Sequence, residues 1–137
     1  MRYLKIALYI LIAVLVALLA GFLWGRAGLS AIQAQLDDTR VRLDLAEGRA
    51  DLLAARVDLF EVNFGRASQR LEAAKPVLRD AVTRLNGAGR DDAASRVNAV
   101  LTRLDRAQQQ VGRLDQSANT GLGEAIALLE QAPAPVK

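Results

Sequence analysis

The residue types that most often carry out chemistry in proteins are scarce in this chain, which contains no cysteine and no histidine. Thiolate or imidazole metal sites, disulfides and catalysis by either side chain are therefore excluded. Carboxylates remain, and they include two adjacent pairs, Asp37-Asp38 and Asp91-Asp92. Because neighbouring residues point in different directions around a helix, we interpret both pairs as helix-capping or solvated acids. We expect no metal and no cofactor.

The sequence motifs of common enzyme and nucleic-acid sites are also missing. The chain has no glycine-rich phosphate loop, no dinucleotide fingerprint and no G-x-S-x-G nucleophile motif. Its arginines alternate with acids, and no basic block is interleaved with the stacking aromatics of a nucleic-acid groove. We therefore expect a protein that is not an enzyme and that binds neither a small-molecule substrate nor nucleic acid.

A long uncharged segment occupies residues 6–24 (IALYILIAVLVALLAGFLW), after a short N-terminal segment at residues 1–5. As a helix it would span about 28 Å, close to the thickness of the hydrocarbon core of a bilayer. Tyr3, Phe22 and Trp24 stand near its ends, where aromatic rings prefer the membrane interface. The segment predicts a transmembrane helix. The alternative is a cleaved signal peptide, although the apolar part of such peptides is usually only about 7–15 residues long.

The residues around this segment suggest an orientation and a packing face. Arg2 and Lys5 lie close together on its N-terminal side, which favours a cytoplasmic N-terminus. The expected location is thus the inner membrane, crossed once, with the helical domain outside the cytoplasm. Small residues recur every four positions and could allow close packing of two transmembrane helices: Ala13, Ala17, Gly21 and Gly25.

A hinge at residues 25–29 is followed by heptad spacing over residues 30–85, which predicts one long coiled-coil helix with a kink near Pro76. Apolar residues occupy the two seam positions of the heptad, a and d. Position a holds Leu29, Leu36, Leu43, Ala50, Val57, Phe64, Leu71, Leu78 and Leu85, and position d holds Ile32, Thr39, Ala46, Leu53, Phe60, Ala67, Ala74 and Ala81. We expect the coiled-coil interface to consist mainly of Leu36, Leu43, Leu53, Val57, Phe60, Phe64, Leu71 and Leu78.

Charged residues flanking the seam favour a parallel pairing of helices. In that arrangement Arg42 faces Glu47 and Arg56 faces Glu61, whereas beyond Phe64 the flanking charges become repulsive.

Phe60 and Phe64 carry the bulkiest side chains of the seam, so their truncation is expected to disrupt packing. Arg66 and Arg70 occupy more polar positions, where alanine should be tolerated.

A second apolar stripe lies opposite the first, and a return arm is expected to cover it. Asn86, Gly87 and Gly89 mark a hairpin turn at residues 86–90, and the arm follows over residues 91–131 with a break near residues 117–123. Residues 132–137 form an Ala/Pro-rich tail, for which we expect disorder. The second stripe consists of Val41, Leu45, Leu52, Leu59 and Val62. The predicted fold class is all-α: a transmembrane helix, then an antiparallel helical hairpin that forms oligomers.

Two stretches, LWGRAGL at residues 23–29 and GRADLLAARVDL at residues 48–59, resemble septum-formation initiator proteins of the FtsB/DivIC type. The resemblance covers about residues 1–60 and implies a single-pass bacterial cell-division protein.

These observations favour a membrane-anchored coiled-coil scaffold. Its expected partners are the bilayer, through residues 6–24, and either further copies of the chain or another helical membrane protein. A cell-division adaptor is the alternative, and a secreted helical binding protein released by signal cleavage is a second alternative.

Overall fold

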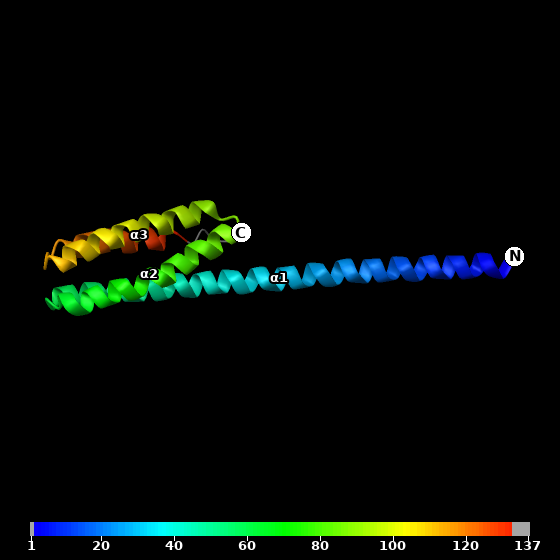
Figure 1. The fold of residues 1–137 in the computed structure, drawn as a ribbon, viewed down its shortest axis with the longest axis horizontal. Coiled ribbons are helices and arrows are strands. Elements are labelled where there is room, and N and C mark those ends of the chain that lie inside the picture. The colour runs from blue at the N-terminus through cyan, green and yellow to red at the C-terminus, as the bar shows by residue number, and fades with distance from the viewer. Residues whose placement is uncertain (1, 133–137) are drawn as a thin grey trace. The chain divides into compact units, whose positions relative to one another are not determined.

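The computed structural model describes the backbone of residues 2–132 and the side chains of residues 11–18 and 32–132. Within this part, all regular structure is helical: α1 (Arg2–Phe60), α2 (Phe64–Gly87), α3 (Asp91–Gly112) and α4 (Ala118–Glu130) (Figure 1). The all-α fold class is confirmed. The chain divides into two compact units, Met1–Leu36 and Asp37–Lys137.

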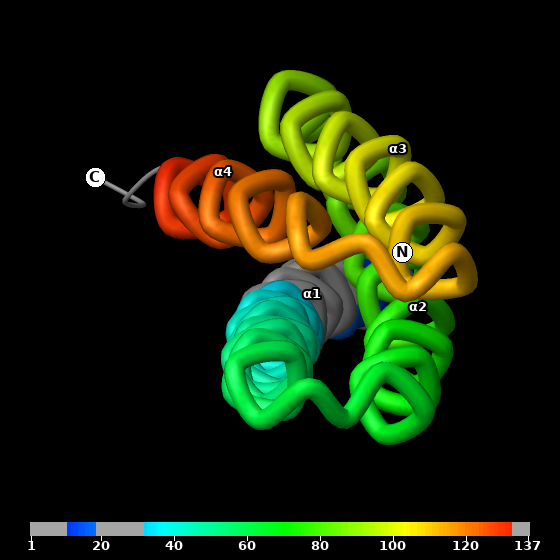
Figure 2. The backbone as a smooth tube through the Cα atoms, turned by 90° about the vertical axis from the view of Figure 1, so that its left-hand side faces the viewer, coloured from blue at the N-terminus to red at the C-terminus, as the bar shows by residue number. Residues whose placement is uncertain are grey.

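The second unit is a four-helix bundle in which successive helices run in opposite directions. The residues that pair between helices establish this order, and Figure 2 shows α1 lying beside both α2 and α4. α1 therefore packs between the first and the last of the helices that follow it, closing the bundle. The pairs are Asp44 with Arg84 (α1 and α2), Lys75 with Asp105 (α2 and α3), Arg103 with Glu124 (α3 and α4), and Arg49 with Glu130 (α1 and α4).

The core of the bundle alternates alanine with leucine and valine, which lets the helices approach closely. Gly48 of α1 marks the tightest approach: a Cβ atom added there would lie 2.6 Å from Leu78 Cδ2 of α2. The buried apolar residues are Val41, Leu45, Leu52, Ala55 and Leu59 of α1; Ala67, Leu71, Ala74, Leu78, Ala81 and Leu85 of α2; Ala93, Ala94, Val97, Val100, Leu104, Ala107 and Val111 of α3; and Ala118, Leu122, Ala125, Ile126, Leu129 and Ala132 in and after α4.

Helices α1, α2 and α3 end in the same kind of turn, with a residue in the left-handed conformation. These residues are Val62, Gly89 and Leu114, with φ of 59°, 68° and 59°. In each turn the residue after the left-handed one donates its backbone N–H to the carbonyl five residues earlier, which is the hydrogen bond of a Schellman motif. The three bonds join Asn63 to Asp58 (2.7 Å), Arg90 to Leu85 (2.9 Å) and Asp115 to Gln110 (3.0 Å). Only one of the three turns uses glycine, the residue for which this conformation carries no steric cost.

The prediction of one helix over residues 30–85 is wrong, because the chain turns at Glu61, Val62 and Asn63. Val62 adopts the left-handed conformation, and the Asn63 side chain caps α2 by accepting a hydrogen bond from the Arg66 N–H at 3.1 Å. Neither glycine nor proline marks the turn. α2 then continues through Pro76 without ending.

The later boundaries also differ in detail. Asn86 and Gly87 are the last residues of α2, while Gly89 lies in the turn to α3. The break in the return arm lies at residues 113–117 instead of 117–123, and α4 includes Gly121 and Gly123. Burial explains why this glycine-containing stretch is helical, since Leu122 lies in the core. Residues 133–137 of the predicted tail lie outside the described residues.

In the first unit, side chains are described for residues 11–18 and 32–36. Ala13 and Ala17 of the predicted transmembrane stripe are exposed. The burial of Gly21 and Gly25 lies outside the described part of the structure. Among the residues that the structure describes, no helix has both the length and the apolar character needed to cross a membrane.

Candidate helix-docking surface

The predicted coiled-coil interface separates into two surfaces with different roles. Leu71 and Leu78 of α2 are fully buried inside the bundle, and Phe64 is partly buried against the same core. Leu71 and Leu78 are therefore not accessible to a second chain, and their assignment to an intermolecular seam is wrong. The heptad spacing runs through the turn at Val62 without a change of phase, but the chain reverses there and directs the a and d residues of α2 into the bundle.

The a and d residues of α1 from Ile32 to Phe60 are exposed. The exposed fractions are 62% for Leu43, 42% for Leu53, 55% for Val57 and 69% for Phe60. Ala46 and Ala50, which complete the spacing, are exposed as well. We call these six residues the α1 seam. In the first unit, Ile32 and Leu36 are also exposed.

The opposite face of α1 packs into the bundle. Burial of Val41, Leu45, Leu52 and Leu59 in the core confirms that the second apolar stripe is covered, whereas Val62 is exposed in the turn. α1 thus has two apolar faces, and the bundle covers only one of them. The α1 seam is the face left open after the chain has used all four of the described helices.

The charges beside the α1 seam are only partly as predicted. Arg42 is exposed and forms an ion pair with Asp38 within α1 at 2.8 Å, and Glu47 is also exposed. Arg56, however, is held by α4, where its Nε donates to Asn119 Oδ1 at 2.8 Å. Because Glu61 lies beyond the end of α1, the predicted Arg56–Glu61 pairing lacks the required helical geometry. Arg42 and Glu47 remain as the pair that flanks the seam.

Gly123 of α4 lies beside the guanidinium of Arg56. A Cβ atom at Gly123 would lie 3.6–3.8 Å from this group, in ordinary van der Waals contact, so the position would also accommodate alanine. The hydrogen bond to Asn119 therefore holds Arg56 against α4.

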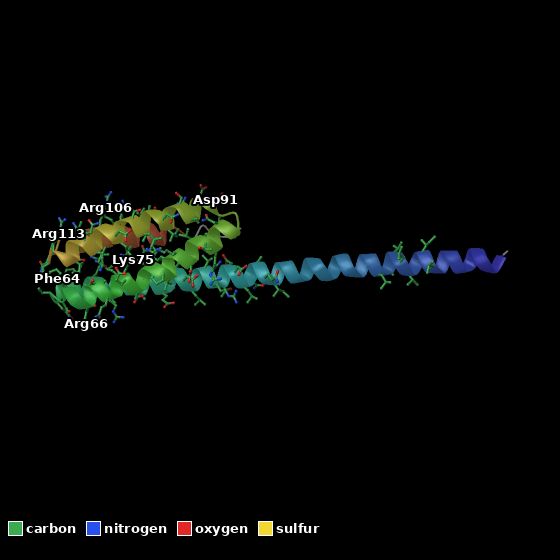
Figure 3. The ribbon with its side chains drawn as sticks, viewed as in Figure 1. Phe64, Arg66, Lys75, Asp91, Arg106 and Arg113 are labelled. Atoms are coloured by element: carbon green, nitrogen blue, oxygen red, sulfur yellow. The ribbon has the colours of Figure 1, made fainter. Side chains whose placement is uncertain are left out.

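A buried carboxylate at the end of α1 was not predicted. The side chain of Asp58 is 4% exposed, and its oxygens lie 3.2 Å from Arg66 Nε and 3.9 Å from Arg70 Nε. Figure 3 shows Phe64 and Arg66 at the start of α2 and Arg113 at the end of α3, all at this end of the bundle. Arg66 and Arg70 are therefore ion-pair partners of a buried acid, and the expectation that they tolerate alanine is revised.

Lys75 is a buried lysine between α2 and α3, beside Glu72 at 3.0 Å and Asp105 at 3.1 Å. Burial lowers the pKa of Lys75, but hydrogen bonds and charge attraction from the two carboxylates outweigh it, so the net pKa is raised above the ordinary value. Asp115 shows the opposite shift: hydrogen bonds from Ser117 lower the pKa of its carboxyl group. Both groups stabilise packing or a turn.

Elsewhere, a polar hollow of about 500 Å³ lies between α3 and α4. It contains Arg103, paired with Glu124 at 3.6 Å, together with Arg106, Gln110, Ser117 and Thr120. Over the described residues, no group of three or more acids is placed to hold a metal ion. The α1 seam is thus the candidate functional surface, and its chemistry is apolar recognition.

Comparison with known proteins found no matching family model, no matching curated protein and no matching solved structure. The resemblance to septum-formation initiators rests on residues 23–29 and 48–59. In the structure, the second of these stretches lies in α1 and serves both of its faces: Gly48, Leu52, Ala55 and Leu59 are buried in the bundle, while Ala50, Leu53 and Val57 belong to the α1 seam.

Proposed function

We propose that this protein is a membrane-anchored scaffold whose α1 seam docks a helix of another chain. One observation carries the proposal: large apolar side chains at heptad spacing, from Leu43 to Phe60, remain exposed after the bundle has formed. A scattered exposed leucine needs no explanation, but a continuous stripe along one helix face marks an interaction surface.

The spacing indicates that the occupant is a helix. Residues three and four apart along a helix form a narrow line that follows a period of 3.5 residues, which matches the line of contact between two supercoiled helices. α1 is already held in helical form by its packed opposite face. Because α1 is already helical, docking loses no conformational entropy for folding this helix, and association is more favourable for that reason.

The size of the seam suggests weak affinity for this contact alone. Leu43, Leu53, Val57 and Phe60 are each about half exposed, so burying each one contributes about 1 kcal/mol. With a matching contribution from the partner helix, the gross gain is about 8 kcal/mol, within the estimated range of about 4–15 kcal/mol that association costs. A contact of this strength benefits from a raised local concentration, which a shared membrane would provide.

The proposed anchor is the uncharged segment at residues 6–24, with Arg2 and Lys5 on the cytoplasmic side and the bundle outside. Ala13, Ala17, Gly21 and Gly25 would then form a face for close packing in the bilayer. Protease added to intact spheroplasts should digest the bundle. Protection until lysis would overturn this orientation, and a mature N-terminus beyond residue 24, found by mass spectrometry, would overturn the anchor in favour of a secreted protein.

The docking surface is tested by placing charges in it. In mild detergent, Leu43→Lys with Val57→Lys should abolish the association of the full-length protein with the chain that docks on the α1 seam. The reason is that two lysines per helix would be forced against an apolar partner helix. The melting temperature of the bundle should change little, since both side chains are exposed. Ser95→Lys with Asn98→Lys on the exposed face of α3 is the matched control. Unchanged association in the seam variant would refute the proposal.

A second candidate is a cell-division adaptor, favoured by the resemblance of residues 23–29 and 48–59 to septum-formation initiators. Such an adaptor would use the same seam to recruit other membrane proteins. A functional fluorescent fusion should then gather at division sites, and an even distribution around the cell envelope throughout the division cycle would count against this role.

A further inference from the structure

We infer that the helix docked on the α1 seam is α1 of a second copy, running parallel and in register. This inference rests on the proposed function and names its partner. Helices α2 and α4 pack on the opposite side of α1, and α3 lies beyond them, so the α1 seam of each copy faces away from its own bundle (Figure 2). Such a pair has two-fold symmetry, and the same residues contribute from each side.

The flanking charges disfavour an antiparallel arrangement of two copies. The g positions of the heptad in α1 hold Arg42, Arg49 and Arg56, together with the uncharged Gln35. Antiparallel helices bring g positions against g positions, which would place arginines against arginines. Parallel helices bring g against e, and Arg42 of each copy then meets Glu47 of the other. The parallel pair gains two attractive contacts and has no like-charge contact at these positions.

The same charges also select the register. Sliding one helix by a heptad loses both Arg42–Glu47 contacts and places one Arg42 against Arg40 of the other copy. The slipped pair gains one Arg49–Glu47 contact in return, but Arg49 already forms an ion pair with Glu130 of α4. Glu47 and Arg42 are both exposed and sit beside the seam. Arg42 already pairs with Asp38 of its own helix at 2.8 Å, so in the in-register pair its guanidinium would bridge Asp38 and Glu47 of the other copy.

Because the chain contains no cysteine, single-cysteine variants of the full-length protein can test this arrangement in the membrane. Residues at equivalent a positions in a parallel, in-register pair come close enough for a disulfide, which needs Cα atoms about 4.4–6.8 Å apart. Mild oxidation should therefore cross-link Leu43→Cys and Val57→Cys separately into dimers. Ser95→Cys on the exposed face of α3 is the matched control and should remain a monomer.

The outcomes separate this inference from the proposed function. Cross-linking at only one of the two seam positions would contradict a parallel, in-register pair and would overturn the inference. No homodimer with either cysteine, while lysines at positions 43 and 57 still abolish association, would also overturn the parallel pair of copies, but the docking surface would stand. If neither the cysteines nor the lysines have an effect, both proposals fail.

A charge exchange provides an independent test. Arg42→Glu alone and Glu47→Arg alone should each weaken dimerisation about fivefold, because each removes two exposed attractive contacts and introduces like charges. The double variant Arg42→Glu, Glu47→Arg restores opposite charges between copies and should recover most of the affinity. No recovery in the double variant would argue against self-pairing, since only a partner that carries both changes can compensate.

Discussion

Replacement of Arg66 and Arg70 by alanine is predicted to destabilise the bundle, because it leaves a buried acid without its counter-ions. Asp58 is 4% exposed, and both arginines approach its carboxylate from α2. One of its oxygens, Oδ2, has no hydrogen-bond partner in the structure, so the two arginines are its main compensation for burial. Their removal would leave a desolvated negative charge between α1 and α2.

The expected loss can be estimated from the exposure of the two partners. Removing one partner from a fully buried ion pair typically costs about 3–5 kcal/mol. The side chains of Arg66 and Arg70 are 58% and 46% exposed, so water screens the pair and can reach the acid once they are gone. We therefore expect a loss of about 2 kcal/mol in the free energy of unfolding. For a domain of this size that corresponds to a fall of roughly 10 °C in melting temperature.

The measurement is urea and thermal unfolding, followed by circular dichroism, of residues 37–137, which include the whole core of the bundle. Arg79→Ala with Arg106→Ala, two exposed arginines on α2 and α3, is the matched control and should change stability by less than about 0.5 kcal/mol. Adding Asp58→Asn to the Arg66/Arg70 variant should restore more than half of the loss, because the uncompensated charge disappears. Equal losses in the two double variants would refute the role of Asp58.

Further substitutions test packing, backbone strain and ionisation in three separate experiments. Gly48→Ala should cost about 1–2 kcal/mol despite its better helix propensity, because the new methyl overlaps Leu78, whereas Gly121→Ala should gain about 0.5–1 kcal/mol; equal urea midpoints would contradict this. Val62→Gly should raise the melting temperature by relieving about 1 kcal/mol of left-handed strain, and a decrease would show that the valine is stabilising. Lys75 has a raised pKa, so its contribution is complete below about pH 10.5 and is lost as the pH rises through the folded-state value. Melting temperatures measured from pH 9.5 to 12 should fall less steeply in Lys75→Met.

Heptad spacing identifies which residues need an apolar neighbour, but it does not say which chain provides that neighbour. Leu43 and Leu78 both occupy a positions of one uninterrupted pattern, yet the first is exposed and the second is buried within the bundle. Only the direction of the chain distinguishes them, and that direction depends on the turn at Val62. Burial of Leu45 and Leu52 was predictable, because a second stripe on the same helix requires its own cover.

The turn itself was missed because its left-handed residue is a valine instead of a glycine, and the capping residue Asn63 was its main sequence marker. Glu61, Val62 and Asn63 include a β-branched residue in a conformation that normally selects glycine, and the Schellman hydrogen bond of Asn63 compensates for part of that cost. The pairing of Asp58 with Arg66 and Arg70 follows from the same turn. Without knowledge of the reversal, these residues seem to lie along one solvated helix, so no local pattern could have brought them together.

The two faces of α1 should divide missense variants of this helix into two genetic classes. Substitutions at Leu45, Leu52 or Leu59 disturb the core, so the protein should be degraded and its steady-state level should fall. Substitutions at Leu43, Leu53 or Val57 leave the core intact, so the protein should accumulate normally and still fail in its role. A mutational scan scored for both abundance and phenotype would therefore follow the heptad, alternating between the two classes along a single helix.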